Sequence, residues 1–200
     1  MNRMSIFAFV AAAFLPLTAQ AFNLTNPTGR FVNKSIADTM HMGTSLQLSS
    51  PAFQNGASIP ARYVRTAAGG ENVSIPVRWS GVPAGTRSLA LSIVDHNPVA
   101  RMWVHWMVID IPAGARSLDA GASGRHMPPG AVELANSFGD VGYGGPQPPR
   151  GSGPHPYVIT LYALNVARLE LKPHTSLAGF RQALMGKTLG KASLTGYYQK

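Results

Sequence analysis

The sequence predicts a mainly β protein: an antiparallel, Greek-key-like β-sandwich with one C-terminal helix and long ordered loops. Short apolar segments recur at regular intervals along the 200 residues, which is typical of two packed antiparallel sheets. Only one segment, near the C-terminus, has the apolar spacing of an amphipathic helix. Stretches rich in Gly and Pro separate these segments, and they form loops because they cannot propagate helices or central strands.

The N-terminus has the three parts of a secretory signal peptide. Arg3 provides a positive charge, residues 6–17 form an apolar run too short to span a bilayer, and Ala19-Gln20-Ala21 is a small-x-small cleavage site. We therefore expect residues 1–21 to be removed and the protein to be exported, to the periplasm if its source is Gram-negative and to the medium otherwise. A buried N-terminal strand or helix is the alternative.

The rest of the chain is expected to form a lead-in segment, residues 22–44, to which we assign no function, and a single domain, residues 45–200. Removal of Arg3 leaves 16 basic against 8 acidic residues, a formal charge of +8 that favours anionic ligands or surfaces. The basic residues are dispersed and are not interleaved with aromatic residues, so we expect no nucleic-acid binding. The chain has no Cys, which excludes disulfides and thiol chemistry.

Three strands are predicted in the first third of the domain. Ser45–Leu48 and Ile59–Val64 are short apolar segments separated by the turn signal Asn55-Gly56. Residues 73–79 alternate apolar and polar side chains, as a half-buried strand does. Pro76 assigns that strand to a sheet edge or a bulge, because proline cannot donate a hydrogen bond to a neighbouring strand.

The middle of the chain contains two long apolar segments. Ser88–Val94 is predicted to be a strand whose end delivers Asp95, and Met102–Ile111 is predicted to be a second strand. Residues 113–130 are rich in Gly, Ser and Pro and are expected to form a loop. A short strand, Ala131–Leu134, follows this loop.

The side chains of residues 102–111 are expected to alternate between two buried faces of the sheet. One face would carry Trp103, His105 and Met107. The other face would carry Val104, Trp106 and Val108.

The segment Gly142–Tyr157 contains five Gly and five Pro among its sixteen residues, so it is either an ordered loop or a flexible linker. An apolar strand, Tyr157–Leu164, follows directly after His155, whereas a linker would be expected to separate two cores. We therefore predict a rigid binding loop that presents His155 at its end, and whose glycines let backbone approach a ligand closely.

A helix is predicted after Thr175 or Ser176, either of which can cap its N-terminus. The helix is expected to end near Gly186, and Ala192–Tyr198 closes the chain as a final strand. The apolar face of the helix is formed by Leu177, Phe180, Ala183 and Leu184.

Asp95, His105 and His155 each follow or lie in an apolar strand, and they are the candidate functional residues. Asp95 can orient a histidine and favour its protonated form, which donates hydrogen bonds to phosphate or sulfate oxygens. Tyr157, two residues after His155 on the same strand face, can add a hydroxyl donor. The alternative is that each histidine is a hydrogen-bonded core residue.

Two groups of residues could be considered for catalysis or metal binding. Asp95, His105 and Ser137 can be imagined as a triad, and Asp95, His96 and His105 as metal ligands, but the sequence gives no geometry for either. There is no Gly-x-Ser-x-Gly elbow and no His-Glu-x-x-His pair. We therefore expect a binding protein without catalytic residues, bound metal or cofactor, rather than a hydrolase.

Several motifs occur in the order and spacing of one known family. They are Phe53-Gln54-Asn55-Gly56 with Ile59-Pro60, residues 72–79, Ser88-Leu89-Ala90-Leu91, Asp95, His105-Trp106, Asn136-Ser137-Phe138-Gly139, Gly142–Tyr157, Leu189-Gly190-Lys191-Ala192 and Thr195-Gly196-Tyr197-Tyr198. Over nearly all of residues 45–198 the chain resembles the phosphatidylethanolamine-binding protein family, also called Raf kinase inhibitor protein-like, and especially its bacterial branch.

This resemblance implies a β-sandwich with a small pocket at one end that binds phosphate-like anions and phospholipid headgroups. Some relatives are reported to dock a kinase or a peptidase, so the alternative is a protein-interaction or inhibitor module in which the Gly/Pro loop docks a partner. The positive charge also suits peripheral contact with an anionic membrane surface. Carried over to this chain, the pocket residues are Asp95, Trp103, His105, Gly144, Gly145, Pro148, Pro149, His155 and Tyr157.

The chain departs from both signature motifs of the family. Asp-Pro-Asp reads Asp95-His96-Asn97, and Gly-x-His-Arg reads Gly153-Pro154-His155-Pro156. We infer that the missing acid and base pair with each other in relatives, because loss of only one would leave an unpaired buried charge. The segments that carry Asn97 and Pro156 should then be neighbours. Many bacterial members also have Cys in the loop, where this chain has Gln147.

Overall fold

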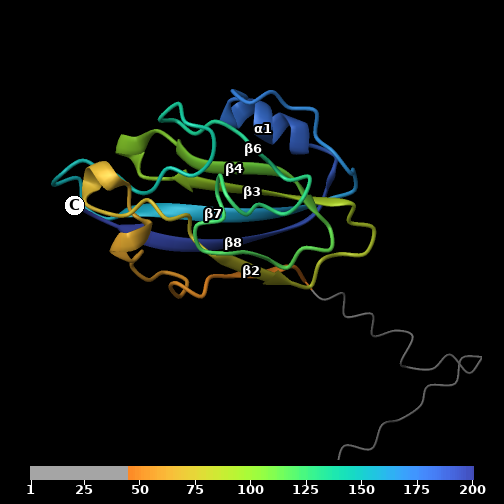
Figure 1. The fold of residues 1–200 in the computed structure, drawn as a ribbon, viewed down its shortest axis with the longest axis horizontal. Coiled ribbons are helices and arrows are strands. Elements are labelled where there is room, and N and C mark those ends of the chain that lie inside the picture. Colours follow the sequence, from red (N-terminus) through yellow and green to blue (C-terminus); the bar gives the residue numbers. More distant parts are fainter. Residues whose placement is uncertain (1–44) are drawn as a thin grey trace, which may run out of the picture. The chain divides into compact units, whose positions relative to one another are not determined.

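The structure is a computed structural model that describes residues 45–200, so the predicted signal peptide and lead-in segment lie outside the described residues. The described chain contains two antiparallel sheets and one α-helix, which confirms the predicted fold class (Figure 1). In residues 45–200, no helix is both long enough and apolar enough to cross a membrane.

The sandwich consists of a three-stranded and a five-stranded sheet. The smaller sheet has the order β1-β2-β5, built from β1 (Gln47–Ser49), β2 (Val77–Ser80) and β5 (Ser117–Leu118). The larger sheet has the order β6-β4-β3-β7-β8, whose last four strands lie side by side in Figure 1. Its strands are β6 (Val132–Glu133), β4 (Trp103–Pro112), β3 (Ser88–Asp95), β7 (His155–Leu164) and β8 (Thr188–Tyr198).

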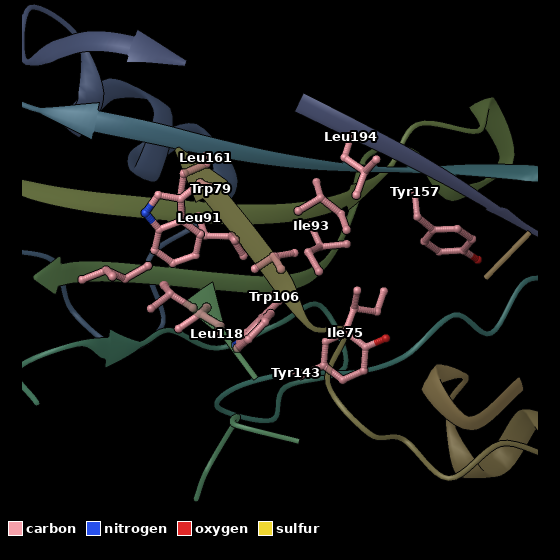
Figure 2. Packing of buried hydrophobic residues seen from close by; sticks show 14 of the residues in the cluster. Ile75, Trp79, Leu91, Ile93, Trp106, Leu118, Tyr143, Tyr157, Leu161 and Leu194 are labelled. Atoms are coloured by element: carbon pink, nitrogen blue, oxygen red, sulfur yellow. The ribbon is translucent and has the colours of Figure 1, made fainter. Parts of the chain in front are cut away.

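The main hydrophobic core lies between the two sheets (Figure 2). Along β2, Val77 and Trp79 are buried while Arg78 and Ser80 are exposed, which is the alternation expected of a half-buried strand. Tyr157 lies at one end of this core, and its hydroxyl points away from the aliphatic side chains in Figure 2. The five-stranded sheet contributes to this core Leu91, Ile93, Trp106, Tyr157, Ile159, Leu161 and Leu194, among others.

Helix α1 (Leu177–Leu184) packs on the other face of the five-stranded sheet. Ser176 caps it as predicted, since the Ser176 hydroxyl oxygen accepts the backbone N–H of Gly179 at 3.2 Å. The second core, beneath the helix, comprises Ala90, Val104, Met107, Ile109, Leu134, Leu164, Leu169, Phe180 and Leu184.

The predicted strand Ile59–Val64 is wrong. A short 3-10 helix, η2 (Ala61–Tyr63), occupies this segment, and a second one, η3 (Thr66–Ala68), follows. Pro60 starts the turn, because its carbonyl accepts the backbone N–H of Tyr63 at 3.0 Å. Ile59 still donates its backbone N–H to the Tyr197 carbonyl at 2.7 Å, while Tyr63 and Val64 are buried without strand pairing.

Two further differences from the prediction concern β2 and β5. β2 begins at Val77, directly after Pro76, which cannot donate a ladder hydrogen bond. Strand β5 lies inside the segment 113–130 that was expected to be a loop, and its two residues pair with Val77 and Arg78. A two-residue strand is too short to leave a periodic signal in the sequence.

The predicted faces of β4 are also wrong, because the strand contains a β-bulge. Ile93 pairs with Trp106 and Val94 pairs with Val104, so His105 is an extra residue in β4. The bulge puts Trp106 into the core between the sheets, whereas Val104 lies beneath the helix. It also re-aims His105, as bulges next to functional sites often do.

The Gly/Pro loop packs closely on the segment around Arg65. A Cβ atom on Gly145 would lie 2.3 Å from the carbonyl oxygen of Tyr63 and 2.6 Å from the backbone nitrogen of Arg65. The backbone N–H of Gly145 donates to Asn72 Oδ1 at 2.7 Å, and that of Arg65 donates to the Pro146 carbonyl at 3.1 Å. The glycine therefore permits close packing on the protein's own backbone, whereas the sequence suggested close approach to a ligand.

We expect Gly145→Ala to destabilise the protein by roughly 2 kcal/mol or more, because the added methyl group must displace one of two backbone segments. Gly114→Ala is the matched control, since nothing lies within 4 Å of its added Cβ. Its free energy of unfolding should change by less than about 0.5 kcal/mol. Urea unfolding measures both, and equal effects of the two substitutions would contradict this packing.

Candidate functional site

A cavity of about 700 Å³ opens at the end of the five-stranded sheet where β3 ends and β4 and β7 begin. Strand register creates this meeting point, because Asp95 lies opposite Trp103 on one side and Tyr157 on the other. Gly144 and Gly145 are absent from the lining within the described residues. Seven of the nine predicted pocket residues line the cavity: Asp95, Trp103, His105, Pro148, Pro149, His155 and Tyr157.

Asp95 and His155 form a buried pair at this end of the sheet. Asp95 Oδ2 lies 2.6 Å from His155 Nδ1, and the two side chains are 3% and 1% exposed. The other carboxylate oxygen, Oδ1, accepts the backbone N–H of Asn97 at 2.8 Å. The histidine that Asp95 orients is therefore His155.

Ser152 completes the hydrogen bonding of His155. The Ser152 hydroxyl donates to the Pro149 carbonyl at 2.7 Å and lies 2.8 Å from His155 Nε2. Because a hydroxyl has one proton, His155 must donate its Nε2 proton to the Ser152 oxygen. A second proton lies between His155 Nδ1 and Asp95, so the pair carries no net charge. Ser152 was not among the predicted site residues, and its one signal in the sequence is its position three residues before His155.

His105 differs from His155 in its hydrogen bonding. Its Nδ1 donates to the Gly144 carbonyl at 2.6 Å, and its ring packs edge-on against Tyr157 with centroids 5.0 Å apart. Burial lowers the pKa of His105 to about 4, and the Gly144 hydrogen bond and the Asp95 charge offset this only in part. The ring is therefore neutral at pH 7 with a lone pair on Nε2, so His105 offers a ligand an acceptor rather than a cationic donor.

The Tyr157 hydroxyl is a buried donor that has no acceptor at hydrogen-bonding distance and angle, although the Asp95 carboxylate lies near it. It is the one buried side-chain nitrogen or oxygen in residues 45–200 that has no hydrogen-bond partner. The residue is 1% exposed, and burial together with the Asp95 carboxylate raises the pKa of Tyr157 well above its usual range. The hydroxyl therefore stays protonated, and it borders the cavity.

The opening of the cavity includes residues that sequence analysis did not select. The 3-10 turn η4 (Pro98–Ala100) holds Val99 there, and Asn97 Oδ1 accepts the Val99 N–H at 2.9 Å. The chain then reverses at Arg101 and Met102, whose φ angles are 49° and 63°. The Asn97-Pro98 dipeptide favours turn initiation and was the available signal.

The segments that carry Asn97 and Pro156 are neighbours, as expected. The backbone N–H of His96 donates to the Pro156 carbonyl at 2.9 Å, and Asn97 Nδ2 contacts the Pro154 carbonyl at 3.5 Å. The proposed acid–base pairing in relatives stays a prediction.

The imagined triad of Asp95, His105 and Ser137 is not assembled. Asp95 bonds His155, while Ser137 Oγ accepts the backbone N–H of Val104 at 2.9 Å. Ser152, His155 and Asp95 have triad-like distances, but His155 donates to Ser152 and so is not poised as its base. In the part of the chain that the structure describes, no three His, Asp or Glu side chains are grouped to hold a metal ion.

Comparisons with known proteins agree with this architecture. Residues 49–199 match the family model described as phosphatidylethanolamine-binding protein. A UPF0098 protein of Methanothermobacter thermautotrophicus is 38% identical over 157 residues, which are 78% of this chain and 99% of the relative. LppC of Mycobacterium tuberculosis, which is named as a lipoprotein, is 39% identical over 154 residues, 77% of this chain and 72% of the relative.

The crystal structure of Escherichia coli YbcL is similar to this chain, with a TM-score of 0.74 and 33% sequence identity. The match covers 78% of this chain and 99% of YbcL, which is described as a new member of the mammalian PEBP family.

The neutral state of His105 predicts a pH dependence of stability. Its pKa is about 4 in the folded protein against 6.5 ordinarily, so below pH 6.5 the unfolded chain binds a proton that the folded protein does not. The free energy of unfolding is therefore unaffected by His105 above pH 6.5. As the pH falls from 6.5 towards 4, it decreases by up to about 1.4 kcal/mol per pH unit.

Urea unfolding at several pH values measures this effect. His105→Gln should have a shallower loss of stability between pH 6.5 and 4 than the wild type. His126→Gln, at an exposed position, should retain the wild-type slope. Parallel pH profiles for the wild type and His105→Gln would contradict a buried neutral His105.

Proposed function

The chain belongs to the phosphatidylethanolamine-binding protein family, and from this membership we propose that it is an exported binding protein for a small phosphate-like anion. The anion is either free or the headgroup of a phospholipid. The cavity that Asp95, His155 and Tyr157 border is the binding site.

The unpartnered hydroxyl of Tyr157 is the observation that carries this proposal. Burying a hydroxyl without an acceptor costs free energy. That cost is recovered when a ligand oxygen accepts a hydrogen bond from the hydroxyl. A phosphate oxygen is a strong acceptor because it is charged. Arg101, at the opening of the same cavity, supplies a cation for the remaining phosphate oxygens.

The other polar groups favour a headgroup that also has a cation. The Asp95–His155 pair has no net charge but keeps carboxylate oxygens near the cavity, and neutral His105 has its Nε2 lone pair. These acceptors suit an ammonium group and repel additional negative charge. We therefore expect O-phosphorylethanolamine to bind more tightly than inorganic phosphate.

Tyr157→Phe tests the binding site because it removes only the hydroxyl oxygen. We expect O-phosphorylethanolamine to bind about tenfold more weakly, as for loss of one hydrogen bond to a charged group. The free energy of unfolding should not fall, because the hydroxyl makes no hydrogen bond within the protein. Calorimetric titration and urea unfolding measure the two quantities.

Tyr143→Phe is the matched control. Its hydroxyl is also buried, but it donates to the Tyr63 carbonyl at 2.7 Å and does not line the cavity. This variant should lose about 1 kcal/mol of stability and keep its affinity for the headgroup. Equal headgroup affinity in wild type and Tyr157→Phe would contradict the proposed site.

Export is the second part of the proposal. The charged, apolar and small-x-small parts of residues 1–21 support it, as does the lipoprotein name of the relative LppC. Mass spectrometry of the protein recovered from the periplasm of expressing bacteria should give an N-terminus at Phe22. Ala21→Arg should accumulate as the uncleaved precursor, because cleavage requires a small residue there. A mature protein that begins at Met1 would refute the signal peptide.

A further inference from the structure

Two large apolar side chains are exposed at the opening of the cavity. Val99 is 59% exposed and Trp103 is 38% exposed, and both line the cavity. Together with Arg101 and Met102 we call them the rim. The other two tryptophans of the chain, Trp79 and Trp106, are buried in the core. An exposed Trp beside an exposed Val at the edge of a cavity therefore sets the rim apart from the core packing.

The rim is held outward at a conformational cost. Arg101 and Met102 both have left-handed backbone conformations, which are unfavourable for residues other than Gly. The Asn97 side chain fixes the turn that carries Val99. Backbone strain of this kind persists only where the surrounding structure enforces it, and it clusters at ligand-binding sites. The exposure of Val99 is thus built into the turn.

The described chain is basic overall, and two of its arginines lie at or beside the rim. Residues 45–200 contain fourteen Lys and Arg against seven Asp and Glu. Of these fourteen, Arg65 is the one within ion-pair distance of a carboxylate in the described residues. Four of the seven carboxylates are engaged in hydrogen bonds within the fold: Asp95, Asp110, Glu133 and Asp140. The rim itself has Arg101, and exposed Arg150 follows the lining residue Pro149.

The depth of the polar groups restricts how a lipid can reach them. Asp95 and Tyr157 are 2% and 1% exposed, so a headgroup must enter the cavity to meet the Tyr157 hydroxyl. A phospholipid that stays in a bilayer can do this only if the bilayer surface touches the rim. Trp side chains favour the bilayer interface, apolar tips insert into it, and Arg side chains bind anionic headgroups.

We propose that the rim is a docking face for an anionic phospholipid bilayer, and that the ligand is taken from the membrane rather than from solution. This inference rests on the proposed function, since it names the source of the headgroup. Val99 and Trp103 insert at the interface while Arg101 and Arg150 contact anionic lipids.

Vesicle sedimentation tests the docking face with vesicles of phosphatidylethanolamine and phosphatidylglycerol. The wild type should bind these vesicles, and Val99→Asp should bind at least tenfold more weakly. Met185→Asp is the matched control, because Met185 is 67% exposed and lies near the start of β8, at the opposite end of the sheet. The seven residue steps from Asp95 to Ser88 along β3 separate the two ends by roughly 24 Å. The vesicle affinity of Met185→Asp should change by less than about twofold.

Fluorescence gives an independent readout. Because Trp79 and Trp106 are buried, a blue shift on adding vesicles, and quenching by brominated acyl chains, report on Trp103. Val99→Ser serves if Val99→Asp fails to fold, and it should weaken vesicle binding in the same direction. Vesicles of phosphatidylcholine alone should bind more weakly than the anionic vesicles, because the Arg contacts are lost.

The outcomes separate the two proposals. Binding of soluble O-phosphorylethanolamine without vesicle binding would overturn the docking face and leave the headgroup site intact. Vesicle binding that requires Val99, without any headgroup binding, would support the docking face and overturn the headgroup site. Equal losses in Val99→Asp and Met185→Asp, or no change in Trp fluorescence, would overturn the rim as the point of contact.

Discussion

The contact between Asp95 and His155 is the interaction on which the site depends. It joins the last residue of β3 to the first residue of β7, with 2.6 Å between oxygen and nitrogen and almost no exposure of either side chain. Two charged groups are tolerated there because each makes a further hydrogen bond. The Asn97 backbone N–H donates to the Asp95 carboxylate, and the His155 imidazole donates to the Ser152 hydroxyl. The turn that carries Val99 and the Gly/Pro loop are thus both tied to one buried pair.

This pair also decides which groups are left for a ligand. His155 is fully engaged by Asp95 and Ser152, and neutral His105 donates its one N–H to Gly144. The Tyr157 hydroxyl remains without an acceptor among the described residues. The site therefore combines a neutralised ion pair, one acceptor nitrogen and one free donor.

Much of the fold was predictable because it follows from local patterns. The apolar runs of β3 and β7 and the cap at Ser176 are readable without knowledge of distant contacts. The bulge at His105 was not predictable, since it depends on how β4 pairs with β3 across the sheet. The turn at Ala61–Tyr63 was mistaken for a strand because burial of its apolar residues leaves the same composition in either conformation.

For the site, the sequence identified the side chains but not their protonation states or hydrogen-bond partners. Position at strand ends selected Asp95, His105, His155 and Tyr157, all of which border one cavity. The charge of His105 could not be predicted, because its pKa depends on a burial that only the folded chain defines. Gly145 was expected to let a ligand approach the backbone, but the space where its side chain would be is occupied by the backbone of Tyr63 and Arg65.

A crystal structure of the protein grown with O-phosphorylethanolamine tests the central claim most directly. The proposal predicts a phosphate oxygen at roughly 2.5–3.0 Å from the Tyr157 hydroxyl oxygen, with the contact between Asp95 and His155 unbroken. A headgroup bound outside this cavity, with the Tyr157 hydroxyl still lacking an acceptor, would contradict it.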